Sequence, residues 1–281
     1  MKHPEDSQKE VGGDETPVHA DVPEGEMTFL EHLEEFRWTV FRSIVAFAIG
    51  VGIVCFFLPQ IGNVLQMPLQ RAYALNDLEY TGLISYKPMG VFMVLIQIAL
   101  LGGFVLSMPF LLYFFACFII PGLTERERKI VRPTCFAAFV LFIAGVAVAY
   151  FILIPITYTF VVRLNQMMGQ KMLLAASEHY NTVVWFSVAT GMTFQFPLIL
   201  VVLIYIQAIT VAQLKSIRRA AFVGIMIFAA MLTPGGDFLS LSLTTLILYG
   251  LYELAIVFGS RMEKNARAAE FNQWDDLETK D

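Results

Sequence analysis

Residues 91–120 read VFMVLIQIALLGGFVLSMPFLLYFFACFII, without a single charged side chain. A membrane-spanning helix needs ~20 apolar residues. This run is longer than an upright helix requires, so we expect the helix to tilt, with a kink at Pro109. The stretch predicts a transmembrane helix, and with it an all-α integral membrane protein.

Five further apolar runs accompany this one. The composition agrees with a membrane protein, since 57% of the residues are hydrophobic and 15% are charged, whereas about a quarter are charged in soluble domains. We therefore predict six transmembrane helices, the third ending at Pro155 and the fourth interrupted by Gln195 and Pro197. The other five runs are Val40–Leu58, Pro133–Ile154, Val183–Ile209, Phe222–Leu232 and Leu239–Phe258.

The last two helices are expected to be short. A helix over residues 220–232 rises only ~20 Å, against ~30 Å of hydrocarbon. Pro234-Gly235-Gly236 then predicts a tight reversal into the sixth helix. Two interpretations stay open. Either the hairpin thins the bilayer or leaves a water-filled hollow, or the fifth helix extends through Lys215 while Arg218 and Arg219 reach the interface.

The basic residues predict the orientation. The segment before the first helix, two of the loops and the segment after the last helix are rich in Arg and Lys, and they all fall on one side of the membrane. By the positive-inside rule, both termini are cytoplasmic. Residues 1–26 form an acidic tail that we expect to be disordered, and they lack the features of a secretory signal. Residues 27–264 form the transmembrane domain, and residues 265–281 a polar tail expected to fray soon after the membrane.

The loops on the opposite side, Pro59–Pro88 and Pro155–Tyr180, contain apolar residues and are expected to pack as an interfacial cap. The three cysteines lack metal or redox spacing and are interpreted as buried free thiols. The four histidines lie outside the apolar runs, which predicts no imidazole within the membrane as a proton relay or metal ligand.

Catalytic signatures are missing from the sequence. It has no Walker lysine loop, no His-Glu-x-x-His and no Gly-x-Ser-x-Gly. These absences argue against an ATPase or a membrane protease, and we expect no enzyme activity, no catalytic residue, no metal and no cofactor. The Gly50-Val51-Gly52 step is interpreted as helix packing rather than nucleotide binding.

An acidic cluster at residues 31–35 precedes the first helix, and Glu127 lies in the first cytoplasmic loop. The predicted topology places both on one membrane face, so Glu35 and Glu127 could approach each other. Carboxylates accept a guanidinium group in a bidentate geometry that lysine cannot match. The alternative is that these glutamates form local salt bridges with Arg37, Arg126 and Arg128.

Three polar residues accompany the later helices. A buried amide such as Gln195 normally faces a partner helix or a wet cavity, so a structural and a functional role are both open. Asp237 is expected to cap the last helix. Glu253 lies ~24 Å further along that helix, where it could pair with Arg261 or receive a partner protein.

The sequence resembles TatC, the multispanning subunit of the twin-arginine protein translocase, over roughly Phe29 to Lys264. Each motif is weak alone, but their order on six predicted spans is specific. They are His-Leu-x-Glu-Phe-Arg at 32–37, Met-Pro-Leu at 67–69, Leu-Ser-Met-Pro at 106–109, Phe118 with Pro-Gly-Leu-x-x-x-Glu-Arg at 121–128, Phe-x-Phe-Pro at 194–197, Leu-Thr-Pro at 232–234 and Tyr-Glu-Leu at 252–254.

The resemblance implies a receptor for folded precursor proteins whose signal peptides carry paired arginines, built as a concave bundle in a bacterial cytoplasmic (inner) membrane. Glu35 and Glu127 match the family carboxylates that receive the arginines. Single-span TatA- and TatB-type subunits are the implied partners, along with further copies of the chain and membrane lipids but no nucleic acid. Because no nucleotide site is visible, the energy source is expected to be the proton motive force. Other positions that match functional ones are Pro68, Phe118, Thr233 at the partner-docking segment, Asp237 and Glu253.

The sequence departs from the family pattern in three places. Gln195 stands where many members have glutamate, Trp38 and Thr39 replace basic residues, and the turn at residues 233–237 is one residue longer. The rival hypothesis is a secondary transporter for a small cationic solute. It would require a mid-membrane ionisable group and usually repeat symmetry, and the sequence shows neither.

Overall fold

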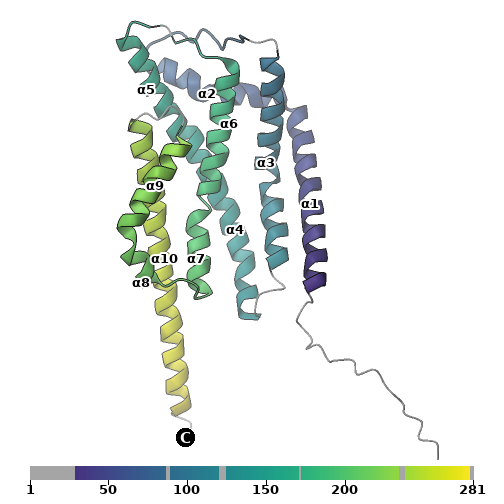
Figure 1. Cartoon of the computed structure of the whole chain (residues 1–281), viewed down its shortest axis with the longest axis vertical. Helices are drawn as coiled ribbons and strands as arrows, with labels where there is room; N and C mark the ends of the chain where they lie inside the picture. The colour runs from purple at the N-terminus through teal and green to yellow at the C-terminus, as the bar shows by residue number, and fades with distance from the viewer. Residues whose placement is uncertain (1–28, 87–88, 120–124, 171, 234–237, 279–281) are drawn as a thin grey trace, which may run out of the picture.

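The computed structural model describes residues 29–86, 89–119, 125–170, 172–233 and 238–278; for residues 119, 125–130, 132 and 265–278 it gives the backbone alone. The described residues form helices joined by turns and irregular segments, with one isolated bridge between Ile84 and Ala175. Figure 1 shows the helices, which are α1 (Phe29–Phe56), α2 (Leu58–Ala74), α3 (Gly90–Ile119), α4 (Glu125–Val148), η2 (Ala149–Leu153), α5 (Ile154–Met167), α6 (Ala176–Thr193), α7 (Phe196–Tyr205), α8 (Val211–Ser216), α9 (Arg218–Leu232) and α10 (Phe238–Glu278).

Five stretches of helix in the described part of the chain are long and apolar enough to cross a membrane. They correspond to five of the six predicted spans, and the predicted all-α membrane fold is confirmed. The sixth predicted span is α9, which has 15 residues and rises ~22 Å. The five are Leu30–Phe56, Gly90–Phe118, Pro133–Met167, Ala176–Tyr205 and Phe238–Lys264.

The third span does not end at Pro155, contrary to the prediction. It continues as one helical rod through α4, η2 and α5 to Met167. Proline lacks the N–H that would bond four residues back, and its ring crowds the preceding turn. The π-helical turn η2 precedes Ile154 and Pro155. The Ile154 N–H donates a hydrogen bond to the carbonyl oxygen of Ala149, five residues earlier. A wider turn thus accommodates the proline without breaking the helix.

The expectation of two short final helices holds only for α9. The last helix, α10, has 41 residues and continues beyond its apolar stretch, which ends at Lys264. The predicted fraying of the tail stays a prediction. The fifth span does not extend straight through Lys215 either, because the chain breaks at Ile217 between α8 and α9. A capping box between Thr210 and Gln213 fixes the start of α8 as a separate helix.

The predicted interruption at Gln195 is confirmed. Helix α6 ends at Thr193 and α7 begins at Phe196. Pro197 lies in the first turn of α7, where its missing N–H leaves no intrahelical bond unmade.

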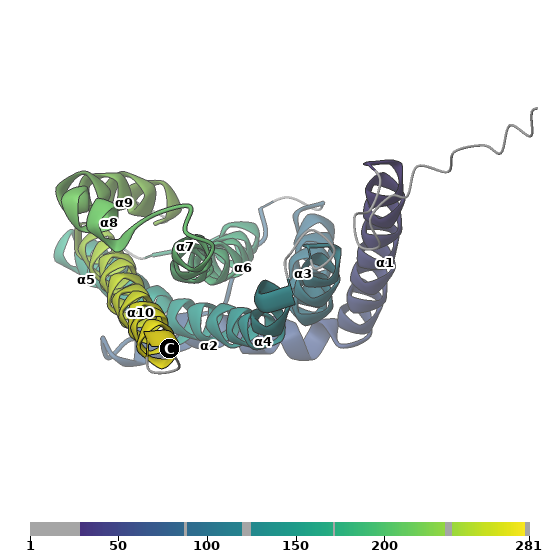
Figure 2. The ribbon, with the colours of Figure 1, turned by 90° about the horizontal axis from the view of Figure 1, so that it is seen from below.

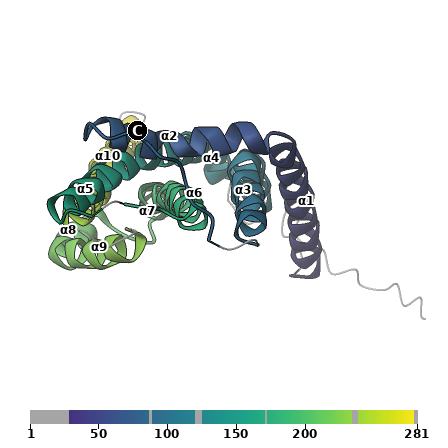
Figure 3. The same ribbon diagram turned by 90° about the horizontal axis from the view of Figure 1, so that it is seen from above.

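The predicted cap is formed largely by α2, which lies across one end of the spans (Figures 1 and 3). Pro68 lies inside α2 and is buried. Because Pro68 has no N–H, the Val64 carbonyl lacks its usual helical donor. The Tyr150 hydroxyl, from η2, donates a hydrogen bond to that carbonyl. This hydrogen bond attaches the cap to the third span, and Pro68 leaves the Val64 carbonyl free to accept it.

Helix α1 stands at one edge of the molecule and packs mainly on α3 (Figure 2). The two backbones touch at a pair of glycines. A Cβ atom on Gly50 would lie 2.7 Å from the Gly103 carbonyl oxygen, and one on Gly103 would lie 2.8 Å from the Val51 backbone. The interpretation of this glycine step as helix packing agrees with that contact.

Viewed along the spans, the helices form a curved wall, with α1 at one end, α9 at the other, and α6 and α7 between them (Figures 2 and 3). This agrees with the predicted concave bundle. The buried core beneath α2 joins Leu69 and Ala72 of the cap to Tyr158 of α5 and Phe186 of α6.

Candidate functional site

The candidate site lies near the start of α1, where one face of the helix carries His32, Glu35 and Phe36. Phe118, near the end of α3, packs against this face. Its ring stacks on that of His32, with 4.4 Å between the ring centroids, and lies 5.4 Å from that of Phe36. Glu35 thus belongs to the same helix face as two residues that contact the Phe118 ring.

One carboxylate oxygen of Glu35, Oε2, is buried and has no hydrogen-bond partner among the side chains that the structure describes. An acceptor that is shielded from solvent without a donor is costly, and a cationic donor arriving there would remove that cost. The neighbouring Glu34 differs, because it is exposed and lies 3.3 Å from the Arg37 guanidinium. Among the described side chains, the local salt-bridge alternative applies to Glu34; the side chains of Arg126 and Arg128 lie outside what the structure describes, so for Glu35 it stays open.

Glu127 lies in the first turn of α4, and its side chain is outside what the structure describes. The backbone places the start of α4 at the same end of the molecule as the start of α1 (Figure 1). The requirement that the two glutamates share one end of the bundle is met by the backbone. The convergence of their carboxylates stays a prediction.

Glu253 does not pair with Arg261. It forms an ion pair with Arg218, with 2.8 Å between Nη2 and Oε2, and it accepts a hydrogen bond from the Tyr249 hydroxyl at 3.0 Å. The reason is tertiary: α9 packs beside α10 and brings Arg218 to Glu253, whereas Arg261 is eight residues further along the same helix, ~12 Å away.

Two other predicted positions belong to the turn before α10. Thr233 is buried at the end of α9, and its hydroxyl donates to the Ala229 carbonyl at 2.7 Å. The Thr233 side chain therefore supplies a hydrogen-bond donor to a carbonyl in the last turn of its own helix. Asp237, the predicted cap of the last helix, lies outside the described residues.

Gln195 bridges two helices. Its Nε2 donates to the Ala138 carbonyl of α4 at 2.9 Å, across the break between α6 and α7. Of the two roles left open by the sequence, this contact supports the structural one.

The prediction of no imidazole within the membrane stays a prediction, but one histidine lies near the start of a candidate span. His179 is completely buried within the fourth span. Its Nδ1 lies 3.0 Å from the Tyr158 hydroxyl and its Nε2 lies 3.0 Å from the Leu65 carbonyl oxygen. Sequence reasoning missed its burial because His179 precedes the apolar run, whereas the α2 cap covers this end of α6. Both ring nitrogens are engaged, and no metal-ligand cluster occurs among the described residues.

The three cysteines are free, as expected, but they are not buried as predicted. Cys55 is exposed and the other two are partly buried.

Comparison with known proteins decides the family. The family model of the Sec-independent protein translocase protein TatC matches residues 31–246. The chain belongs to the TatC family. It is 32% identical over 234 residues to a TatC protein of Synechocystis sp., covering 83% of this chain and 88% of that protein. It is also 32% identical over 235 residues to the Aquifex aeolicus TatC protein, covering 83% of this chain and 95% of that protein.

The fold agrees with the family. A crystal structure described as the twin arginine translocase receptor TatC superposes with a TM-score of 0.70 at 31% identity, covering 82% of this chain and 98% of that one. The resemblance inferred from the sequence motifs is thereby confirmed. This TatC-family chain is a multi-pass membrane protein and a component of a protein translocase complex, which is a transport function rather than a classical enzymatic one.

Proposed function

We propose that this chain is the receptor subunit of a twin-arginine translocase, which binds the paired arginines of signal peptides at Glu35 and Glu127. The observation that carries the proposal is the buried Oε2 of Glu35, for which no described residue supplies a hydrogen-bond donor. Glu35 lies on the helix face that packs against the Phe118 ring. A guanidinium supplies the missing donors in a planar fork, and its charge complements the carboxylate. Lysine lacks that geometry, which would explain selectivity for arginine.

The aromatic groups beside Glu35 have a second role in this proposal. Arginine stacks on aromatic faces as well as pairing with carboxylates. Phe118 and His32 form a stacked pair on the α1 face that carries Glu35. One arginine of the pair would engage Glu35 near this ring stack, and the other Glu127 at the start of α4.

The rest of the proposal concerns topology and partners. Both termini lie in the cytoplasm of a bacterium, and the chain resides in the inner membrane. Single-span TatA- and TatB-type subunits assemble beside the short α9 and the start of α10, together with further copies of this chain. The proton motive force drives transport. The 15-residue length of α9 supports local bilayer thinning at that position.

The test is binding of a fluorescent Arg-Arg signal peptide to the full chain in nanodiscs, with a Lys-Lys peptide alongside. Charge-assisted hydrogen bonds contribute ~1.5–3 kcal/mol, so Glu35→Gln should weaken Arg-Arg peptide binding about 10- to 100-fold. Glu34→Gln is the matched control, because Glu34 is adjacent to Glu35 in the sequence but is exposed and already paired with Arg37.

Equal effects of the two substitutions, or equal affinity of the two peptides for the unmodified chain, would contradict the proposed receptor site. Retained helix content by circular dichroism in both variants would show that the loss of binding is local.

A further inference from the structure

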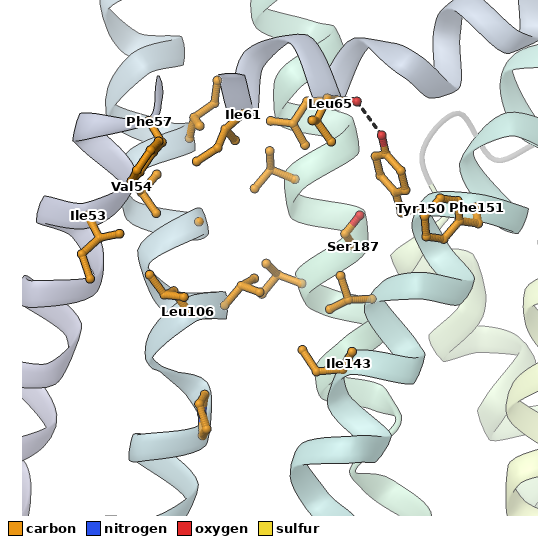
Figure 4. A pocket seen from close by; sticks show the side chains of 18 of the residues that line it. Ile53, Val54, Phe57, Ile61, Leu65, Leu106, Ile143, Tyr150, Phe151 and Ser187 are labelled. Carbon is orange, nitrogen blue, oxygen red and sulfur yellow. Dashed lines mark hydrogen bonds between the residues drawn. The ribbon is translucent and has the colours of Figure 1, made fainter. Parts of the chain in front are cut away.

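An apolar cavity of about 760 Å³ lies directly beneath α2, at the opposite end of α1 from Glu35. Its volume falls in the ~300–1,000 Å³ range of pockets that hold a small ligand. Its walls come from α1, α3, η2, α4 and α6, and α2 crosses above it (Figure 4). Residues that line it include Ile53, Phe57, Leu106, Ile143, Phe151 and Ser187.

The cavity has walls that are partly exposed on the outer surface of the bundle. Several lining side chains are also exposed on the outer surface, among them Phe57 at 47%, Leu106 at 43% and Phe151 at 57%. These residues belong to, or directly follow, membrane-spanning segments, so the surface they share faces hydrocarbon. The lining is almost wholly apolar, which excludes stable filling by water. An occupant supplied by the bilayer itself fits this opening.

A cation lies near the mouth, on α2. Arg71 follows Val64 by seven residues, so the two occupy the same stripe of the helix, ~10 Å apart along its axis. Val64 lines the cavity and accepts the Tyr150 hydroxyl hydrogen bond. Within the described part of the chain, no ion pair or hydrogen bond engages the Arg71 side chain.

We propose that this cavity binds one anionic phospholipid, with an acyl chain beneath α2 and the phosphate on Arg71. Helix α2 lies across the ends of the spans, as an interfacial helix does, so Arg71 is at headgroup level and the cavity at acyl-chain depth. Arginine presents a planar fork of donors that matches phosphate oxygens. The lipid would fill the space between the cap and the third span, and it is independent of the receptor site at Glu35.

The test uses the full chain in phosphatidylcholine vesicles that contain phosphatidylglycerol with a photoreactive diazirine on one acyl chain. After illumination, labelled peptides are mapped by mass spectrometry. We expect label on the α3 and α6 walls of the cavity. Ser187→Phe and Ile143→Trp fill the cavity from two different walls, and each should remove most of the label. Ser187→Ala is the matched control, because it leaves the space open, and it should label as the unmodified chain does.

The headgroup is tested separately. Arg71→Gln should lower labelling by phosphatidylglycerol about fivefold and leave labelling by a photoreactive phosphatidylcholine unchanged. Arg163→Gln is the control cation, since Arg163 already donates to Asn76. Because Arg71 is exposed, this variant keeps its fold even if a cavity-filling variant does not.

Three outcomes would overturn the proposal. One is label that persists in both cavity-filling variants. Another is an Arg71→Gln variant that still labels equally with phosphatidylglycerol. The third is capture, in the same cavity, of a photoreactive signal-peptide segment or a second copy of the chain in place of lipid.

Discussion

Replacing Gly50 by alanine should separate α1 from α3. The added Cβ would lie 2.7 Å from the Gly103 carbonyl oxygen, whereas carbon and carbonyl oxygen approach to about 3.3 Å at closest in ordinary contacts. The helices must therefore move apart by roughly 0.6 Å at this point, because the atom in the way belongs to the backbone and cannot rotate aside. Overpacking of this kind costs ~1–3 kcal/mol.

Gly52→Ala supplies the control two residues away. A Cβ there meets nothing within 4 Å. Both substitutions raise helix propensity by the same ~1 kcal/mol, so their difference isolates the contact with α3. We expect Gly50→Ala to lower the free energy of unfolding by ~1–3 kcal/mol relative to Gly52→Ala.

The assay is reversible unfolding in mixed detergent micelles, followed by circular dichroism and by fluorescence. Gly50→Ala combined with Gly103→Ala should be less than additive, because both act on one contact. Equal stability of the Gly50→Ala and Gly52→Ala variants would refute the close approach of the two backbones.

Two smaller effects concern the polar links between helices. Tyr150→Phe should lower the free energy of unfolding by about 1 kcal/mol. Adding Pro68→Ala to this variant should restore most of that loss, because alanine supplies the missing N–H. A double variant no more stable than Tyr150→Phe alone would refute this role of Pro68. Gln195→Leu removes the hydrogen bond between α7's start and α4 and should cost ~0.6 kcal/mol, the usual value for such bonds in membranes; an unchanged unfolding midpoint would show that the bond contributes nothing.

Much of the receptor hypothesis was available from motifs in the sequence, and the family assignment confirms the resemblance. The environment of Glu35 was not available. Sequence spacing puts Glu34 and Glu35 on different sides of α1, but it does not say which side another helix covers. Only the packing of Phe118 against α1 distinguishes a carboxylate with a buried oxygen from an exposed one paired with Arg37.

The sequence by itself determined the helical membrane fold and the break at Gln195, because apolar run length and proline chemistry act locally along the chain. Only the tertiary structure decided that the helix continues past Pro155, that Glu253 pairs with Arg218, and that His179 is buried beneath α2. Each of these depends on segments distant in sequence or on a choice between a break and a wider turn. The hydrophobicity of one segment does not indicate which neighbouring helix supplies the partner of a charged side chain, or which helix buries a polar one.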